Sequence, residues 1–306
     1  MRVRLLRLLT LIVVVSATGL LRAQDQTQTQ DRAQTKEDQL DIPRSSDPGK
    51  QPFIRQFVAD EIQIWTSPFK GSSYTSRGFT TYVVPFALIT GALIATDQKT
   101  GDLLPNTEDQ STWSLRISQI GAPYTLAGMA AAMYLVSRAT GDKKARETGF
   151  LGAIAIAHSQ IVTQGLKLAS QRIRPLEYRE ENHGGTGFFK GGDSFPSGHA
   201  SGSFALATVF TYEYGRDHKW VPYTAYGLAS VVAASRLSAQ KHWVSDIFVG
   251  GTMGFLVGRF VYKSHHNPAL DGVAPKRAER LVPQVGFSSR GLTLSWDLGR
   301  PSYGGD

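Results

Sequence analysis

The chain has 306 residues, enough for one large domain or two small ones. It contains no cysteine, which excludes thiol chemistry and cysteine-bound metal. The formal net charge is +8, but residues 1–23 hold four arginines and no acidic residue, so that 29 basic and 25 acidic side chains remain beyond them, a net charge of +4. That mild excess argues against a nucleic-acid-binding protein.

The first residues have the pattern of a secretory signal peptide over 1–23. Three arginines precede an apolar run at 8–15, and the small residue Ala23 ends the segment. An uncleaved anchor is the alternative. Residues 24–52 are polar with almost nothing to bury, so we expect a disordered tether there. The predicted location is the cell envelope after export, as a periplasmic protein that is either soluble or membrane-associated.

A helical domain is predicted over residues 53–265. The stretch FIRQFVADEIQIW spaces its apolar residues as an amphipathic helix does. Six apolar segments rich in Ala, Gly, Leu and Ile follow, and their length favours helix over strand. They cover residues 80–96, 120–138, 146–170, 199–214, 221–236 and 243–262. We therefore expect an all-α bundle of about six helices.

The tail over residues 266–306 has a different pattern. From Arg280 the sequence RLVPQVGFSSRGLTLSWDL alternates around SSRG, which predicts a short β-hairpin. An irregular extended tail is the alternative.

The apolar segments give a mixed membrane signal. A spanning helix needs roughly 20 mostly apolar residues. The uncharged run at 117–137 meets that length, whereas 221–235 is short. With six spans and an exported N-terminus, the basic stretch SRATGDKKARE would also face outward, against the positive-inside tendency. These criteria favour a bundle that is soluble or that contacts a membrane surface.

The first motif is KLASQRIRP, which contains Lys167, Arg172, Arg174 and Pro175. Pro175 disfavours helical geometry at Arg174, so we expect the helix to end here, with Lys167 and Arg174 near one another. Two cations at a helix C-terminus can simply complement the helix dipole. This motif alone therefore predicts no site.

The second motif is SFPSGH. Ser197 and Gly198 lie where a helix begins, with His199 in its first turn. The unpaired N–H groups of a helix N-terminus bind anions, and histidine is suited to proton transfer near neutral pH. Ser197 can also act as an N-cap, and the two roles are compatible.

The third motif is SRLSAQKHWVSD, which contains Ser235, Arg236, His242 and Asp246. On a helix, His242 and Asp246 would share a face and could hydrogen-bond. A carboxylate that holds one imidazole nitrogen leaves the other free to attack an electrophile. An ordinary surface pair is the alternative.

The order of the helices brings the three motifs together. In an up-down bundle, the connection between the third and fourth apolar segments and that between the fifth and sixth lie at the same end. Fixed cations at such a place suit an anion, and the arginine fork suits phosphate oxygens. The residues expected to converge are Lys167, Arg174, His199, Arg236 and His242.

The combined pattern K-x6-RP, PSGH and SR-x5-H-x3-D resembles the type 2 phosphatidic acid phosphatase and vanadium-dependent haloperoxidase superfamily. It is present without departure over about residues 167–246. The resemblance implies a phosphatase with a phosphohistidine intermediate, in which His242 attacks phosphorus, His199 transfers protons and Asp246 orients His242. The phosphate-binding groups that it implies are Lys167, Arg174, Ser197, Gly198 and Arg236.

The resemblance also implies the ligands. The substrate would be a phosphorylated small molecule or a lipid, with a lipid phosphate or an isoprenyl pyrophosphate favoured. No cofactor or metal is expected, although vanadate could bind as a phosphate mimic. A vanadium-dependent haloperoxidase and a non-catalytic membrane protein are the alternatives. No pattern predicts an oligomeric state.

Residues outside the motifs carry further expectations. The loops at 97–119 and 176–193 are expected to line the entrance, with Phe188 and Phe189 as candidates for acyl-chain contact. Among the remaining histidines, His158 is predicted to be packed in the core. His218, His265 and His266 are predicted to be solvated loop residues.

Overall fold

A computed structural model describes most of the helical domain. The described residues are 53–70, 78–105, 107–180 and 185–271, with the backbone of 284–288 and 291–295. The predicted signal peptide at 1–23 and the predicted tether at 24–52 lie outside them.

The domain is all-α, as predicted. In chain order its α-helices are α2 (Phe53–Thr66), α4 (Val84–Asp102), α5 (Glu108–Ser118), α6 (Pro123–Thr140), α7 (Lys143–Ser170), α8 (Pro175–Glu180), α9 (Gly198–Tyr214), α10 (Trp220–Ser238) and α11 (Val244–His265). A π-helical segment, η3 (Phe79–Val83), leads into α4. Short 3-10 turns occur at η1 (Ser67–Phe69), η4 (Gln119–Gly121) and η5 (Pro268–Leu270). The six apolar segments correspond to α4, α6, α7, α9, α10 and α11, and the amphipathic stretch is α2.

Two helices lie where loops were expected. In the segment 97–119, α5 is polar and so gives no apolar stripe, but it begins with a readable capping signal. The Thr107 hydroxyl accepts the Gln110 N–H, and Glu108 and Asp109 follow in the first turn. In the segment 176–193, α8 begins at Pro175, where proline is well tolerated. The expected loops are therefore partly helical.

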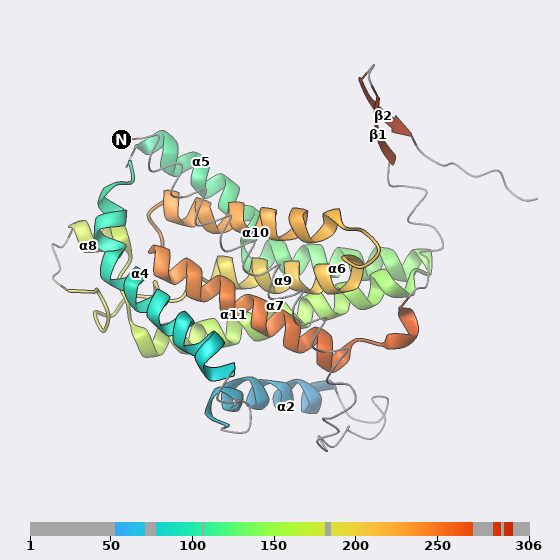
Figure 1. The fold of residues 1–306 in the computed structure, drawn as a ribbon, viewed down its shortest axis with the longest axis horizontal. Coiled ribbons are helices and arrows are strands. Elements are labelled where there is room, and N and C mark those ends of the chain that lie inside the picture. The colour runs from blue at the N-terminus through green and yellow to red at the C-terminus, as the bar shows by residue number, and fades with distance from the viewer. Residues whose placement is uncertain are drawn as a thin grey trace, which may run out of the picture.

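Helix α9 is the centre of the bundle. Most of its residues are buried, as is typical of a helix surrounded by others. Ala205 and Val209 pack with α7 and α11, Phe204 and Ala207 pack with α10 and α11, and Leu206 packs with α6 and α7. In Figure 1, α7, α9, α10 and α11 run side by side along the long axis of the molecule.

A glycine stripe on α11 sets its distance from α9. A Cβ added at Gly254 would lie 2.1 Å from the Ser201 carbonyl oxygen. One added at Gly250 or Gly258 would lie 2.5 Å from the carbonyl oxygen of Ser197 or Ala205, respectively. Small residues four apart allow two helix backbones to approach closely. This contact brings the start of α9 against the start of α11, where two of the motifs lie.

The tail contains the predicted hairpin. Strands β1 (Gln284–Ser288) and β2 (Gly291–Ser295) pair antiparallel, with Gln284 opposite Ser295 and Ser288 opposite Gly291.

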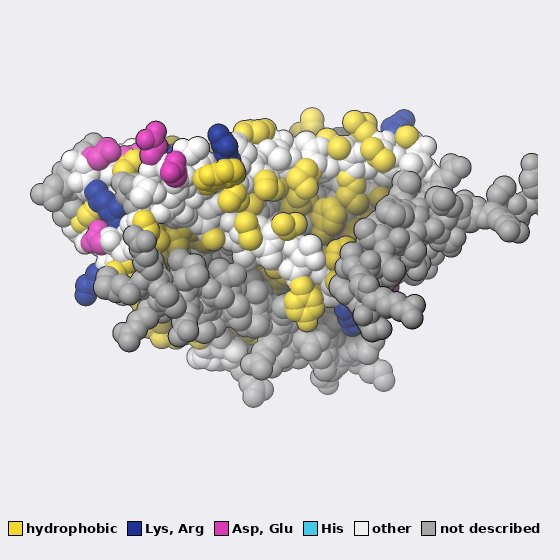
Figure 2. Space-filling model, turned by 90° about the horizontal axis from the view of Figure 1, so that it is seen from above, with side chains coloured by type: hydrophobic (Ala, Val, Ile, Leu, Met, Phe, Trp, Pro, Cys, Tyr) yellow, Lys and Arg dark blue, Asp and Glu magenta, His cyan; other side chains and the backbone are white. Residues whose placement is uncertain are grey.

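Three helical stretches of the described chain are long and apolar enough to cross a membrane: Phe79–Asp102, Glu108–Thr140 and Val244–His265. None of the apolar window in the first of these is buried, and Leu88 is 68% exposed. Hydrophobic side chains are spread along the face of the molecule that Figure 2 shows. Water disfavours such a surface, so the protein is membrane-associated, and the soluble alternative is disfavoured.

Candidate active site

The three motifs meet at one end of the bundle, the end near α8 in Figure 1. Helices α7 and α10 end there, and α9 and α11 begin there. The Ser197 N–H donates to the Asp246 carbonyl oxygen at 3.0 Å, and the Ser170 hydroxyl donates to the Phe195 carbonyl oxygen at 2.8 Å. These bonds join the second motif to the third and to the end of α7.

Lys167 and Arg174 lie close together, as expected. Helix α7 ends at Ser170, earlier than Pro175, because Gln171 adopts a left-handed conformation with φ 44°. Both cations contact one carboxylate, that of Asp193. Arg174 donates to its two oxygens from Nε at 2.8 Å and from a terminal nitrogen at 2.9 Å, and the Lys167 Nζ lies 3.7 Å from Oδ2.

Asp193 is a residue that the motifs did not indicate. Hydrogen bonding to Arg174 lowers the pKa of its carboxyl to about 2, so it is ionised at neutral pH. Its two oxygens occupy the donors of Arg174 in the paired geometry that a phosphate would use. The structure therefore holds an internal anion on two of the cations that were expected to bind phosphate.

Ser197 acts mainly as a cap. Its hydroxyl accepts the Ala200 N–H at 3.4 Å, and its own N–H is taken by the Asp246 carbonyl oxygen. The expectation that N–H groups near Ser197 and Gly198 hold phosphate is therefore wrong for the Ser197 N–H, because that donor is already used.

His199 lies in the first turn of α9 and is half-buried. Its pKa is lowered to about 3, firstly because burial disfavours the charged form. The ring is therefore neutral while no anion is bound. The fixed charges of Arg236, Lys167 and Arg174 lower this pKa further, and a protonated His242 would act in the same direction. All five residues that the sequence predicted to converge are thus close enough to interact.

Arg236 is buried in the last turn of α10. One terminal nitrogen donates to the Ser118 hydroxyl at 3.1 Å. Its Nε is buried and has no hydrogen-bond partner among the described residues. A buried donor without an acceptor is costly, so this nitrogen is suited to an anionic ligand.

His242 lies in the turn before α11 rather than on a helix with Asp246, so the predicted shared helix face is wrong. Its Nδ1 is 2.8 Å from the Ser194 carbonyl oxygen and 3.5 Å from Asp246 Oδ2. A carbonyl only accepts, so Nδ1 carries the proton and Nε2 carries the lone pair. Burial also lowers the pKa of His242, which keeps the imidazole neutral and nucleophilic.

Asp246 supports this turn through several bonds. One carboxylate oxygen accepts the Ser194 hydroxyl at 2.5 Å and the Trp243 N–H at 2.9 Å. The main acceptor that orients His242 is thus the Ser194 carbonyl oxygen. Asp246 in turn fixes Ser194 by accepting its side-chain hydroxyl.

Arg172 is the largest residue that the sequence reasoning left without a role. It is 1% exposed and donates to Asp246 at 2.7 Å, to Ser245 at 2.7 Å and to Asp97 at 2.8 Å. It also lies over the rings of Phe188 and Trp243. The only sequence signal was Asp97, an acidic residue at the end of an otherwise apolar segment. Phe188 therefore packs on Arg172, whereas Phe189 is 77% exposed.

Four histidines outside the motifs lie among the described residues, and two of them are placed as predicted. His158 is fully buried, as predicted, and its Nδ1 contacts Glu61 at 2.5 Å. His218 is exposed, as predicted. The solvated assignments of His265 and His266 are wrong, because His265 contacts Asp60 at 2.7 Å and His266 lies among three carboxylates.

Comparison with known proteins agrees with the motifs. Residues 148–269 match the PAP2 superfamily. Over 70 residues the chain is 41% identical to lipid A 1-phosphatase of Porphyromonas gingivalis, which covers 23% of this chain and 16% of that protein. Over 76 residues it is 36% identical to lipid A 4'-phosphatase of the same organism, which covers 24% of this chain and 31% of that protein. The matched segments thus span less than a third of either relative.

A solved structure, that of the first transmembrane PAP2 type phosphatidylglycerolphosphate phosphatase from Bacillus subtilis, is also similar. The match has a TM-score of 0.41 at 18% identity and covers 68% of this chain and 94% of that one.

Proposed function

We propose that this chain, whose residues 148–269 match the PAP2 superfamily, is a metal-independent phosphatase that acts on phosphate monoesters of lipids at a membrane. The observation that carries the proposal is the cluster of Lys167, Arg174 and Arg236 around two neutral imidazoles. The similar lipid A phosphatases support a phosphorylated lipid as the substrate. An isoprenyl pyrophosphate is the second class, which only the motifs of the sequence suggest.

The geometry supports catalysis by a histidine nucleophile. His242 Nε2 attacks phosphorus, and the bond from phosphorus to the leaving oxygen breaks. The three cations stabilise charge on the other phosphate oxygens, which is most of what phosphoryl transfer needs. His199 donates a proton to the leaving oxygen and then accepts one from the water that hydrolyses the phosphohistidine.

The bound phosphate supplies the condition for that proton transfer. His199 is neutral in the free site firstly because it is buried and secondly because cations lie around it. A phosphate dianion among Lys167, Arg174 and Arg236 offsets their charge and raises the pKa of His199 toward its usual range. Protonation of His199 is therefore coupled to substrate binding.

An assay series tests the function. The purified protein is given p-nitrophenyl phosphate and then a panel of lipid phosphates and isoprenyl pyrophosphates, in detergent and excess EDTA. We expect phosphate release, fastest with a lipid substrate. Halogenation with vanadate, peroxide and bromide but no phosphate release would instead indicate a haloperoxidase. No turnover in either assay would support the non-catalytic membrane protein.

The proposed location is the periplasmic side of the cell envelope, supported by the apolar run near the N-terminus and by the membrane-associated helices. The absence of cysteine allows a direct test. In Lys190→Cys, an exposed position near Asp193, the thiol should react in intact cells with a maleimide that cannot cross the inner membrane. Labelling only after lysis would place the site in the cytoplasm.

Asp193→Asn is expected to tighten binding of orthovanadate and phosphate by about 2–5-fold. The carboxylate is partly exposed and competes with the anion for Arg174, and exposed ion pairs are worth about 0.2–1 kcal/mol. Inhibition constants measure the change. Glu177→Gln is the matched control, since among the described residues the hydrogen bond of this carboxylate goes to the Arg174 backbone N–H. Equal or weaker anion binding in Asp193→Asn would show that the Asp193 carboxylate does not compete with the anion for Arg174.

His199 is expected to make stability depend on pH in a defined direction. Its pKa of about 3 lies below its unfolded value near 6.5, so the stabilising contribution is present above pH 6.5 and is lost as the pH falls toward 3. The melting temperature should therefore fall less between pH 7 and 4 in His199→Gln than in the wild type. Added phosphate should reduce the acid loss in the wild type. An equal fall of the melting temperature between pH 7 and 4 in the two proteins would contradict the assignment of this acid loss to His199.

A further inference from the structure

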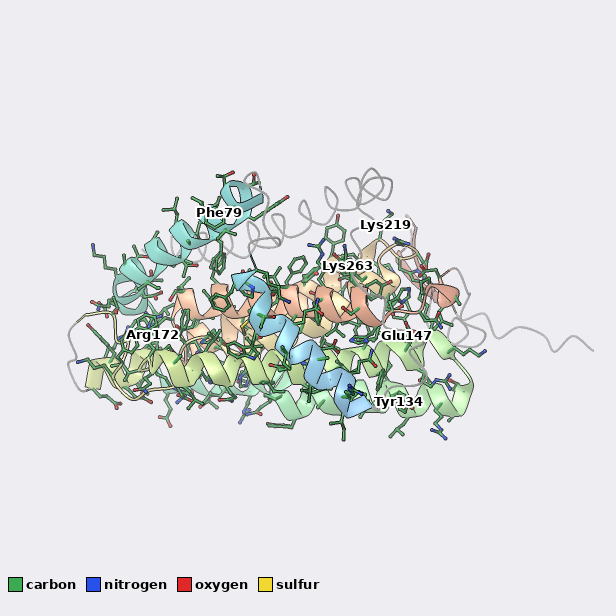
Figure 3. All side chains as sticks on the ribbon, turned by 90° about the horizontal axis from the view of Figure 1, so that it is seen from below. Phe79, Tyr134, Glu147, Arg172, Lys219 and Lys263 are labelled. Carbon is green, nitrogen blue, oxygen red and sulfur yellow. The ribbon has the colours of Figure 1, made fainter. Side chains whose placement is uncertain are left out.

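A second cluster of ionisable residues lies far from the proposed active site. Glu147 from α7, Glu213 from α9 and His266 after α11 each offer a ligand atom, and these atoms lie within 4.8 Å of one another. Figure 3 labels Glu147 and Arg172, which lie toward opposite ends of the molecule. The cluster therefore has no part in the phosphate chemistry described above.

The imidazole of His266 is held as a metal ligand would be. Its Nε2 lies 3.0 Å from Asp271 Oδ1, so a proton on Nε2 is donated to that carboxylate. Nδ1 then carries the lone pair, and it faces Glu147 Oε1 at 2.9 Å and Glu213 Oε1 at 3.3 Å. A histidine that binds metal typically donates its other N–H to a carboxylate in this way. The Tyr262 ring, stacked at 4.4 Å, fixes the ring plane.

The two glutamates that face Nδ1 are also prepared for a cation. Glu147 Oε1 accepts the Asn267 N–H at 2.7 Å, which orients that carboxylate. Glu213 is 4% exposed, and its Oε2 is buried with no hydrogen-bond partner among the described residues. A buried carboxylate oxygen without a donor is strongly unfavourable, and a cation would satisfy it.

The surroundings add negative potential. Glu213 lies in the last turn of α9, and His266 directly follows α11, so the C-terminal ends of two helix dipoles point at the cluster. The neighbouring Lys144 is paired with Asp217 at 3.1 Å. Three carboxylates thus surround one imidazole, and the charge that would balance them is a divalent cation.

We propose that Glu147, Glu213 and His266 Nδ1 form a binding site for a divalent transition metal of the Zn²⁺ or Mn²⁺ class, with Asp271 as the carboxylate that orients His266. One imidazole nitrogen with carboxylate oxygens suits these ions, whereas Ca²⁺ prefers six to eight oxygen ligands. Three protein ligands leave a further position for water. Since the ligands come from three different elements, the metal would fasten the ends of α7, α9 and α11 together.

The test is metal binding by the full chain, purified in detergent, stripped with EDTA and titrated with Zn²⁺. We expect one tightly bound equivalent and a melting temperature that rises with Zn²⁺ concentration. The near-isosteric Glu213→Gln and the variant His266→Gln should each weaken binding by about 100-fold or more and remove the thermal shift. His218→Gln, which changes an exposed histidine, is the matched control and should bind as the wild type does.

Two results would overturn the proposal. Absence of stoichiometric binding to the wild type would show that protons alone neutralise the cluster. Unchanged binding in both Glu213→Gln and His266→Gln would show that other residues, such as His199 and His242 of the proposed active site, hold the ion. Because the readout is bound metal and not turnover, the outcome is independent of the phosphatase assays.

Discussion

His242→Asn is expected to reduce phosphate release by at least about 1000-fold and to retain the fold. The asparagine amide can keep the hydrogen bond to the Ser194 carbonyl that Nδ1 makes in the wild type, but it has no nucleophile in place of Nε2. Loss of an attacking group typically costs more than loss of a positioned acid, which costs about 100–10,000-fold. The initial rate with p-nitrophenyl phosphate measures the effect, and circular dichroism reports the fold.

Trapping of the intermediate separates the roles of the two histidines. Rapid quenching with base should capture a labelled phosphohistidine in the wild type and none in His242→Asn. His199→Gln should accumulate the label with p-nitrophenyl phosphate, because this leaving group needs little acid assistance, whereas the attacking water lacks its base. His218→Gln should match the wild type. Label that persists in His242→Asn would assign the nucleophile elsewhere.

The helices that contribute most to the core were predictable because their apolar runs are long. The same property located the ends of α7 and α10 and the starts of α9 and α11, and hence the convergence of Lys167, Arg174, His199, Arg236 and His242. Helix α5 was missed because it is polar and is recognisable only by its cap. The sixth apolar segment was predicted to begin at residue 243, which leaves His242 in the turn before α11, as observed, so only the helix face shared with Asp246 was wrong.

The residues that were missed depend on partners far away in the sequence. Asp193 can pair with Arg174 only because α7 ends early and the chain after it brings the Arg174 side chain beside Asp193. His266 looks like part of a solvated loop until Glu147, 119 residues earlier, is placed beside it. Arg172 was named in the first motif without a role, and in the structure its buried guanidinium is paired with Asp97, 75 residues earlier. Sequence spacing carries no information on such pairs.

Arg172→Met is expected to destabilise the protein by about 3–5 kcal/mol. Arg172 is the shared counter-charge of Asp97 and Asp246, both of which are 0–1% exposed. Removing one partner of a buried ion pair leaves an uncompensated charge, which costs about that amount. Arg172→Lys should also be strongly destabilising, because an ammonium group does not reproduce the planar fork that reaches Asp97, Ser245 and Asp246 together.

Asp97→Asn in the Arg172→Met background provides the decisive comparison, measured as melting temperature in detergent. Neutralising Asp97 removes one of the two unpaired charges, so the double variant should be more stable than Arg172→Met alone. Arg179→Met is the matched control at the same end of the bundle, since its contacts to Asp102 and Gln240 are partly exposed and should be worth less than about 1 kcal/mol. If the melting temperature of Arg172→Met equals that of the control Arg179→Met, the network does not stabilise the fold. If the double variant recovers no stability, the cost arises from lost packing on Phe188 and Trp243 rather than from charge.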